Sequence, residues 1–326
     1  MHALWRTGST YMWGKFRSRD ELCCFFEPFH ESLIAKTREG LLGDFARAAV
    51  KFRHETISRN YYEEYKVADG GGVENFRSRF IMDRYSLGVS EEDEDLEVYI
   101  QSLLDTAEER GQRPVLQFNR SILRAKWMKH HFGGAHIYLN RNLGDVYDSY
   151  IENGYYLPCY VSIVRQNADH PIFAEIANRF NLEPYSYSGK HNEDTVIDAA
   201  KRFKARQVSC SRIARKLSGQ DKKEITAFFW ATGLASATGY ADMIVDTDRI
   251  ISGQGRTMPQ MFTDVSGLEF DFSDLRLKTK GHEPFEITRG MRNIIRRAVE
   301  KIGPNWETLS SPDMAMNTRV QFAMTM

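Results

Sequence analysis

The sequence has few cysteines, and they form no recognisable metal or disulfide pattern. Its four cysteines (Cys23, Cys24, Cys159 and Cys210) make no CxxC pair and no Cys/His array with zinc-ligand spacing. Two of them are adjacent, which is a poor start for a disulfide framework. We therefore predict reduced thiols and a cytoplasmic protein.

Long apolar runs are also absent. No stretch reaches the roughly 18 apolar residues that a transmembrane helix needs, and no signal peptide is recognisable. The sequence therefore predicts no membrane span. The start is abrupt, because only Met1 to Trp5 precede the first residue with a predicted chemical role, Arg6. Either the first strand is very short or a few native residues are missing.

The chain has no excess charge of either sign. Its 326 residues carry 44 basic and 44 acidic side chains, so no overall field attracts nucleic acid or a membrane. An anionic partner would need a local patch. The stretch Lys201 to Lys223 offers one, with nine Lys/Arg against the single acidic residue Asp221. A solvated helical face explains it, and so does a groove for an anionic acceptor such as a glycan. We expect no nucleic-acid partner.

The most regular pattern lies between residues 114 and 153. Val115–Asn119 has strand character, Ser121–Phe132 has helical spacing, Ala135–Asn140 is again strand-like, and a second helix follows Gly144. This βαβα order predicts parallel strands flanked by helices, with ligands at the carboxyl ends of the strands.

The remaining segments fit the same α/β class, and we predict a single domain over residues 1–326. Short strands are predicted at His2–Trp5 and Leu22–Phe26, with a helix from about Tyr11 to Arg19 between them. Residues 155–245 read as a mainly helical insertion. Residues 262–275 are expected to return to the sheet or its edge, and residues 286–302 form a basic amphipathic helix.

The loop after the first predicted strand has the parts of an anion site. Gly8 lets backbone N–H groups approach an oxyanion, Ser9 and Thr10 add hydroxyl donors, and Arg6 adds a positive charge at a helix start. The loop is not a Walker motif, because five residues separate Gly8 from the next glycine where that motif has four. An ordinary turn before a capped helix stays an open alternative.

A second candidate anion grip follows the strand that ends at Asn140. Arg141 closes that strand, and Ser149 lies about two helical turns further on. Two anion grips on strand ends suit a nucleotide that carries phosphates at both ends of its ribose. A surface arginine and a helix serine are the plainer alternative.

These two elements resemble the motifs of the sulfotransferases that use 3′-phosphoadenosine 5′-phosphosulfate (PAPS). The family's 5′-phosphosulfate loop has a basic residue, then Ser-Gly-Thr-Thr, then an aromatic; residues 6 and 8–11 match it. Its 3′-phosphate motif is Arg-Asn-Pro-x-Asp-Val-x-x-Ser; residues 141–149 depart from it only by Leu143 for proline. The resemblance covers about residues 2–31 and 113–153.

The resemblance implies a parallel sheet of P-loop nucleotide-kinase-like form, PAPS as the donor, and no required metal. The donor-binding residues that it implies are Arg6, Thr7, Gly8, Ser9, Thr10, Tyr11, Arg141 and Ser149. The Gly-rich stretch 252–257 resembles the loop that closes over the nucleotide in that family by role only.

The catalytic base is expected after the second strand. Cytosolic small-molecule sulfotransferases have Lys-Thr-His where this chain has residues 117–120 without a histidine, which argues against that type. The segment from Phe26 to His30 is similar to the Glu-Pro-Leu stretch of carbohydrate sulfotransferases, so Glu27 is the first candidate for the base. His30 and Glu31 stay open as alternatives. Arg120 is placed to stabilise charge on the sulfuryl group, or to anchor the helix that follows.

The sequence thus predicts PAPS-dependent transfer of a sulfuryl group to a hydroxyl, with a carbohydrate or glycolipid as the preferred acceptor. One alternative is a kinase-like transferase that uses ATP, which the malformed Walker loop disfavours. Another is a catalytically silent protein that binds nucleotide or glycan.

Overall fold

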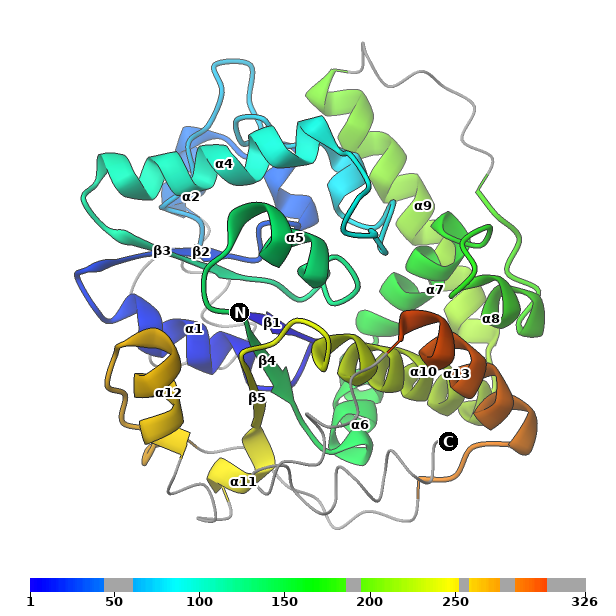
Figure 1. The fold of residues 1–326 in the computed structure, drawn as a ribbon. Coiled ribbons are helices and arrows are strands. Elements are labelled where there is room, and N and C mark those ends of the chain that lie inside the picture. The colour runs from blue at the N-terminus through cyan, green and yellow to red at the C-terminus, as the bar shows by residue number, and fades with distance from the viewer. Residues whose placement is uncertain (44–60, 186–194, 252–257, 276–284, 304–326) are drawn as a thin grey trace.

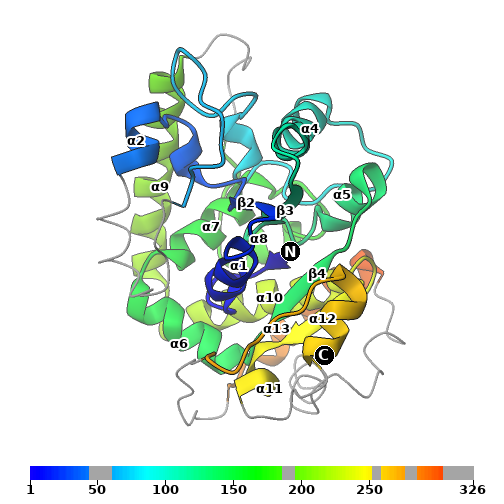
Figure 2. The same ribbon diagram turned by 90° about the vertical axis from the view of Figure 1, so that its left-hand side faces the viewer.

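The structure is a computed structural model that describes residues 1–43, 61–185, 195–251, 258–275 and 285–303 (Figures 1 and 2). It is of the α/β class, with a small parallel sheet flanked by helices. The strands in the described ranges are β1 (His2–Ala3), β2 (Leu22–Phe26), β3 (Arg113–Gln117), β4 (Ile137–Asn140) and β5 (Met243–Asp246).

The strands form one three-stranded and one two-stranded sheet, which meet along β1. β1 pairs with β4 and β4 with β5, while β2 pairs with β3, all in parallel. A parallel bridge from His2 to Phe118 connects the two parts, and the Ala3 amide donates to the Phe118 carbonyl at 3.0 Å. The resulting spatial order is β2-β3-β1-β4-β5, so β1 lies at the centre.

Helices alternate with these strands and continue in a largely helical stretch after β4. The longer helices are α1 (Ser9–Arg17), α4 (Glu94–Glu109), α5 (Ala125–Phe132), α6 (Leu143–Asn153), α7 (Tyr156–Gln166), α9 (Val196–Lys216), α10 (Gly219–Ala237), α12 (Met258–Ser266) and α13 (Arg289–Ile302). Shorter ones are α2 (Arg38–Gly43), α8 (Ala174–Arg179), α11 (Thr247–Ile251) and two 3₁₀ turns, η1 (Glu31–Leu33) and η2 (Ser78–Phe80).

The two faces of the sheet carry separate apolar cores because side chains alternate along each strand. In β4, Tyr138 packs into the core formed with α7, α10 and α13. Its neighbours Ile137 and Leu139 pack into the other core, which includes residues of α1, α4 and α12. Figure 1 shows α7 to α10 and α13 gathered to one side of the sheet and α1 and α12 to the other.

The sequence predicted most of the sheet correctly, and the differences have a clear cause. β2 has the predicted bounds, while β1 is two residues long where four were expected. Four helices fill most of residues 155–245, but the stretch ends in β5, which pairs with β4. Residues 262–275 return to the edge of the sheet without adding a strand to it, because α12 extends to Ser266 and packs against the edge strand β5, and no strand follows it up to Leu275. A four-residue apolar run such as β5 carries no periodicity that distinguishes it from the end of a helix.

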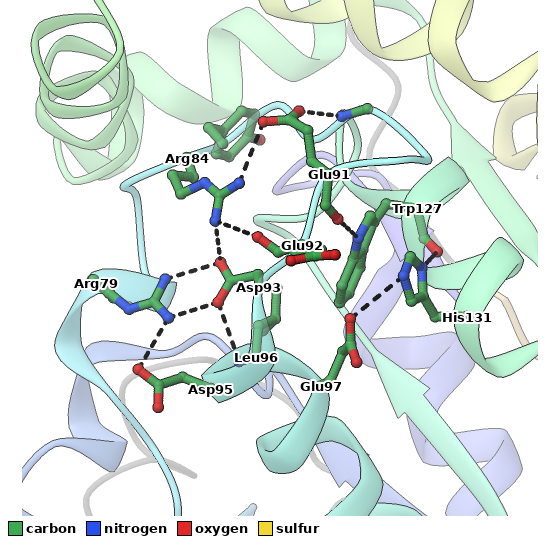
Figure 3. A network of polar contacts seen from close by, with 12 residues as sticks. Arg79, Arg84, Glu91, Glu92, Asp93, Asp95, Leu96, Glu97, Trp127 and His131 are labelled. Atoms are coloured by element: carbon green, nitrogen blue, oxygen red, sulfur yellow. Dashed lines mark hydrogen bonds and ion pairs between the residues drawn. The ribbon is translucent and has the colours of Figure 1, made fainter.

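The carboxylate-rich run at 91–97 begins α4 and is partly buried (Figure 3). Asp93 caps the helix by accepting from the Leu96 amide at 3.3 Å. Its carboxylate also accepts from Arg79 at 2.6 and 2.8 Å and from Arg84 at 3.0 Å. Burial opposes the charge of Asp93, but Arg79 outweighs it and lowers the pKa. This run therefore anchors the start of α4.

Candidate functional site

The carboxyl ends of β1, β2, β3 and β4 carry the charged residues that the sequence singled out. β1 lies between β3 and β4, whereas the chain leaves β1 toward β2 at the outer edge. The chain connections therefore lead to opposite sides of β1, which makes β1 a topological switch point of the sheet. In open α/β sheets, ligands bind at such a switch point. Arg6 to Gly8 follow β1, Glu27 follows β2, Arg120 follows β3 and Arg141 follows β4.

The loop after β1 is held in a backbone conformation that suits anion binding. Arg6 has a φ of 69° and Gly8 a φ of 88°, both in the left-handed region. The Thr7 hydroxyl donates to the Leu4 carbonyl at 2.8 Å and fixes the turn from inside. α1 begins at Ser9, so the amides of its first turn have no partners within the helix and face the end where an anion is stabilised.

The second predicted motif lies against this loop. The Nε atom of Arg6 donates to the Ser149 hydroxyl at 2.5 Å. Nη1 of Arg141 donates to the Arg6 carbonyl at 3.1 Å. The two motifs are more than 130 residues apart in sequence, yet side chains from both meet at one point.

Arg141 is anchored more deeply than a surface arginine. It is buried, and its guanidinium lies 3.8 Å from a carboxylate oxygen of Asp145 and 3.6 Å from one of Asp248. The neighbouring Asn142 caps α6 by accepting from the Gly144 amide at 2.9 Å. The carboxylates hold Arg141 in place beside the loop, and they also compete with any phosphate for it.

Glu27 lies in an unusual position directly after β2. Its φ is 41°, and it is one of five non-glycine residues with positive φ among the described residues. Glu27 is buried, and its Oε1 accepts from Asn119 at 2.7 Å while Oε2 accepts from Arg120 at 2.5 Å. A left-handed conformation costs such a residue of order 1–3 kcal/mol, and strain of this kind clusters at functional sites. Two of the five non-glycine residues with positive φ, Arg6 and Glu27, therefore lie at this edge of the sheet.

Arg120 bridges two carboxylates at the same edge. Its Nη2 donates to Glu31 Oε2 at 2.7 Å and to the Tyr155 hydroxyl at 3.2 Å, and the Trp5 ring lies 5.0 Å from its guanidinium carbon. Burial opposes the charge on Arg120, but the two carboxylates outweigh it and raise the pKa well above its ordinary value. Arg120 is thus a permanent cation beside Glu27.

Glu31 is an ionised partner of this cluster. Burial favours its neutral form, but His30, Arg120 and a hydrogen bond from the Tyr155 hydroxyl outweigh burial and lower its pKa to about 2. Arg120 therefore balances two carboxylates, Glu27 and Glu31, and the three groups form a fixed charge triad.

His30, an alternative candidate for the base, has one ring nitrogen engaged by the backbone. Its Nδ1 accepts from the Ser32 amide at 3.1 Å, and burial lowers its pKa and keeps the ring neutral near pH 7. The neutral ring therefore carries its proton on Nε2, which lies 3.7 Å from Glu31 Oε2. His30 and Glu31 are therefore close neighbours, without a hydrogen bond between them.

One predicted donor-binding side chain points elsewhere, and one predicted loop cannot be placed. The Tyr11 hydroxyl donates to Asp274 at 2.5 Å, and Lys15 pairs with the same carboxylate at 2.8 Å. The Gly-rich stretch 252–257 lies outside the described residues.

Two residues of the cluster were missed by sequence reasoning. Asn119 positions Glu27, and Tyr155 contacts both Glu31 and Arg120. Asn119 precedes Arg120 at the end of a predicted strand, so its place in the chain gave a signal. Tyr155 gave none, because its position depends on the turn between α6 and α7.

A large cavity of about 870 Å³ lies at the opposite, amino-terminal edge of the sheet. Its lining is mostly apolar and includes Leu104 of α4, Val115 of β3 and Ile137 of β4. Cavity size and the charged cluster therefore point to different edges. We place the candidate site at the carboxyl edge, because ligands of open parallel sheets bind there and the charges converge there.

Comparisons with family models, with curated protein sequences and with solved structures found no match. In the part of the chain that the structure describes, no three His, Cys, Asp or Glu side chains are arranged to hold a metal ion. No helix among the described residues is long and apolar enough to cross a bilayer.

Proposed function

We propose that this chain transfers a sulfuryl group from PAPS to a hydroxyl of a carbohydrate or glycolipid. The observation that carries the proposal is the contact of Arg6 with Ser149 and with Arg141. It joins the loop that resembles a 5′-phosphosulfate site to the segment that resembles a 3′-phosphate site. A nucleotide with phosphates at both ends of its ribose matches two anion grips that lie side by side.

The proposed donor site uses the first turn of α1 and Arg6 for the 5′-phosphosulfate end. Arg141 and Ser149 then contact the 3′-phosphate. The strand order β2-β3-β1-β4-β5 supports a P-loop kinase-like form of the sheet, since it places the loop after β1 at the switch point.

The chemistry follows from the neighbouring strand ends. The acceptor hydroxyl oxygen attacks sulfur in line, the bond from sulfur to the 5′-phosphate oxygen breaks, and that phosphate takes the released electron pair. Glu27 accepts the hydroxyl proton, since each of its oxygens has a second lone pair beyond the one that Asn119 or Arg120 uses. Arg120 stabilises the negative charge that develops beside it.

Nucleotide binding tests the proposal directly. Adenosine 3′,5′-bisphosphate should bind at least tenfold more tightly than AMP, because charge-assisted bonds to a 3′-phosphate contribute about 1.5–3 kcal/mol. Isothermal calorimetry measures both constants, with ATP as a third ligand. Equal affinity for the bisphosphate and AMP contradicts the 3′-phosphate assignment, and tighter binding of ATP favours a kinase-like transferase. Radiolabelled PAPS with a panel of neutral and anionic glycans then tests turnover.

A further inference from the structure

Helix α9 is unusually exposed for its length. Of its 21 residues only Cys210 and Ala214 are buried, and it packs mainly along α7. Its outer face carries five exposed cations: Lys201, Lys204, Arg212, Arg215 and Lys216. At 100° per residue, these five positions fall within an arc of about 120° and span about 22 Å of the helix axis. We call this set the α9 stripe.

The charge of the stripe is not balanced locally. None of its five members forms an ion pair with a carboxylate in the described part of the chain. The one acidic residue of α9, Asp198, lies in its first turn and bonds to the capping Thr195 at 2.7 Å. A chain with equal numbers of basic and acidic residues therefore gathers uncompensated positive charge along one line.

The segments that flank the stripe contact elements that also contribute to the candidate site. At the start of α9, a Cβ on Gly72 would lie 3.5 Å from Val196, and the Gly72 amide donates to the carbonyl of Lys36, shortly after η1. At the other end, the Tyr147 hydroxyl of α6 donates to the carbonyl of Gly219 at 3.3 Å. Tyr147 lies on α6, the helix that also carries Ser149, two residues before it. Figure 2 shows α9 and α6 along the same flank of the molecule.

We propose that the α9 stripe docks an extended polyanionic glycan, which is the acceptor whose hydroxyl reaches Glu27. This inference rests on the proposed function and narrows its acceptor class from carbohydrates in general to linear anionic polysaccharides. A straight row of cations matches a polymer whose charges repeat along a line. An anionic membrane fits less well, because an interfacial helix needs a broad apolar face. On α9 that face covers α7, and only Ile197 and Val208 are exposed large apolar residues there.

Binding of dextran sulfate, with neutral dextran as the matched uncharged polymer, tests the stripe without requiring turnover. The stripe variant is Lys204→Glu with Arg212→Glu. The control variant, Lys126→Glu with Arg289→Glu, makes the same change in net charge at two exposed cations on α5 and α13. We expect the wild type to bind dextran sulfate and not dextran. The stripe variant should bind about tenfold more weakly, and its affinity should depend less steeply on salt, because fewer counterions are released.

The control variant should keep its affinity within about twofold. Equal weakening of both variants means that net charge alone drives binding, which overturns the stripe. Tighter binding to phosphatidylserine vesicles or to duplex DNA than to dextran sulfate overturns the choice of a glycan. Calorimetry with adenosine 3′,5′-bisphosphate on the same proteins separates the two proposals. Loss of polyanion binding with intact nucleotide binding assigns polymer binding to the stripe. Wild type that binds the polymer but no bisphosphate contradicts the proposed function, and with it the role of the polymer as acceptor, but it leaves polymer binding by the stripe in place.

Discussion

The two edges of the same parallel sheet differ in kind. At the carboxyl edge, Arg6, Glu27, Arg120 and Arg141 bring full charges together, and two of these residues have left-handed backbones. The amino-terminal edge holds the cavity of about 870 Å³, which has a mostly apolar lining. The first edge is crowded and charged, whereas the second is roomy and nearly neutral.

Two buried histidines at the amino-terminal edge, His2 and His136, are satisfied by a chain of hydrogen bonds. The Gly133 carbonyl can only accept, so His136 donates to it through Nε2 at 3.0 Å. His136 Nδ1 must then accept from His2 Nε2 at 3.0 Å, which leaves His2 Nδ1 to accept from the Ser121 hydroxyl at 2.7 Å. Burial lowers the pKa of His2 well below its ordinary value and that of His136 to about 4. The chain of hydrogen bonds is complete and uncharged at neutral pH.

This comparison shows that cavity volume is a poor guide to the candidate site in this molecule. A closed, neutral chain of hydrogen bonds stabilises the fold, and its two histidines are already engaged with each other and with the chain. Charges that are buried and paired, on a strained backbone, are costly to maintain and are typical of functional sites. The experiments below separate the two edges by their different responses to substitution and pH.

The largest expected effect is at Glu27. Glu27→Gln should lower turnover by about 10²–10⁴-fold, the usual contribution of a positioned base, and leave donor affinity nearly unchanged. Glutamine keeps the size of the side chain and one accepting oxygen, but it cannot take a proton at neutral pH. Single-turnover rates with saturating PAPS and acceptor measure the loss, and calorimetry measures donor binding.

Glu31→Gln is the matched control for Glu27→Gln. It also removes one of the two carboxylates that Arg120 bridges, but on a side chain that His30 and Tyr155 already engage. We expect it to lower turnover by about tenfold or less. Equal losses in the two variants would assign the effect to the charge balance of Arg120 and remove Glu27 as the base.

The sequence predicted the strand ends well because the signals there are local. β2 is a short apolar run that ends before Pro28, so Glu27 could be placed at a strand terminus without a structure. Arg141 follows from the strand that ends at Asn140. Both predictions depend only on residues that are close in sequence. A parallel sheet then brings the carboxyl ends of its strands to one edge.

Pairings that depend on long-range packing could not be predicted. The contact of Tyr155 with Arg120 depends on the turn between α6 and α7. β5 follows a helical stretch and was not predicted, because a run of four residues is too short to show the periodicity that distinguishes a strand from a helix. The hydrogen bond between His2 and His136 joins residues 134 apart in the chain. Tertiary structure decides each of these.

The amino-terminal edge predicts a pH dependence of stability instead of function. The pKa of His136 is about 4 in the folded chain against an ordinary value of 6.5, so the unfolded chain binds more protons between these values. Stability is therefore complete above about pH 6.5 and is lost as pH falls toward 4. The loss attributable to His136 between pH 7 and pH 5 is about 2 kcal/mol. Urea unfolding at several pH values measures it.

His136→Gln should remove the part of the pH dependence of stability that His136 contributes, while the affinity for the donor at pH 7 stays within twofold of the wild type. Glutamine can still donate to the Gly133 carbonyl and accept from His2. The exposed His130 supplies the control, since His130→Gln should leave the slope with pH unchanged. Weaker bisphosphate binding by His136→Gln would show that the amino-terminal edge takes part in the site, and the contrast between the edges would fail.

The smallest expected effects distinguish two arginines within the carboxyl edge. Arg6→Lys and Arg141→Lys both keep the positive charge but lose the fork of donors, so each should raise the donor KM about tenfold. The conservative change protects the fold, because Arg141→Ala would remove the cation beside Asp145 and Asp248.

Arg6 is placed at the 5′ end beside the scissile bond, so Arg6→Lys should also lower kcat by about tenfold. In the proposed donor site Arg141 contacts the 3′-phosphate, away from the sulfur, so Arg141→Lys should leave kcat at saturating donor within about twofold. Equal kcat losses in single-turnover measurements would mean that the two arginines do not hold opposite ends of the donor.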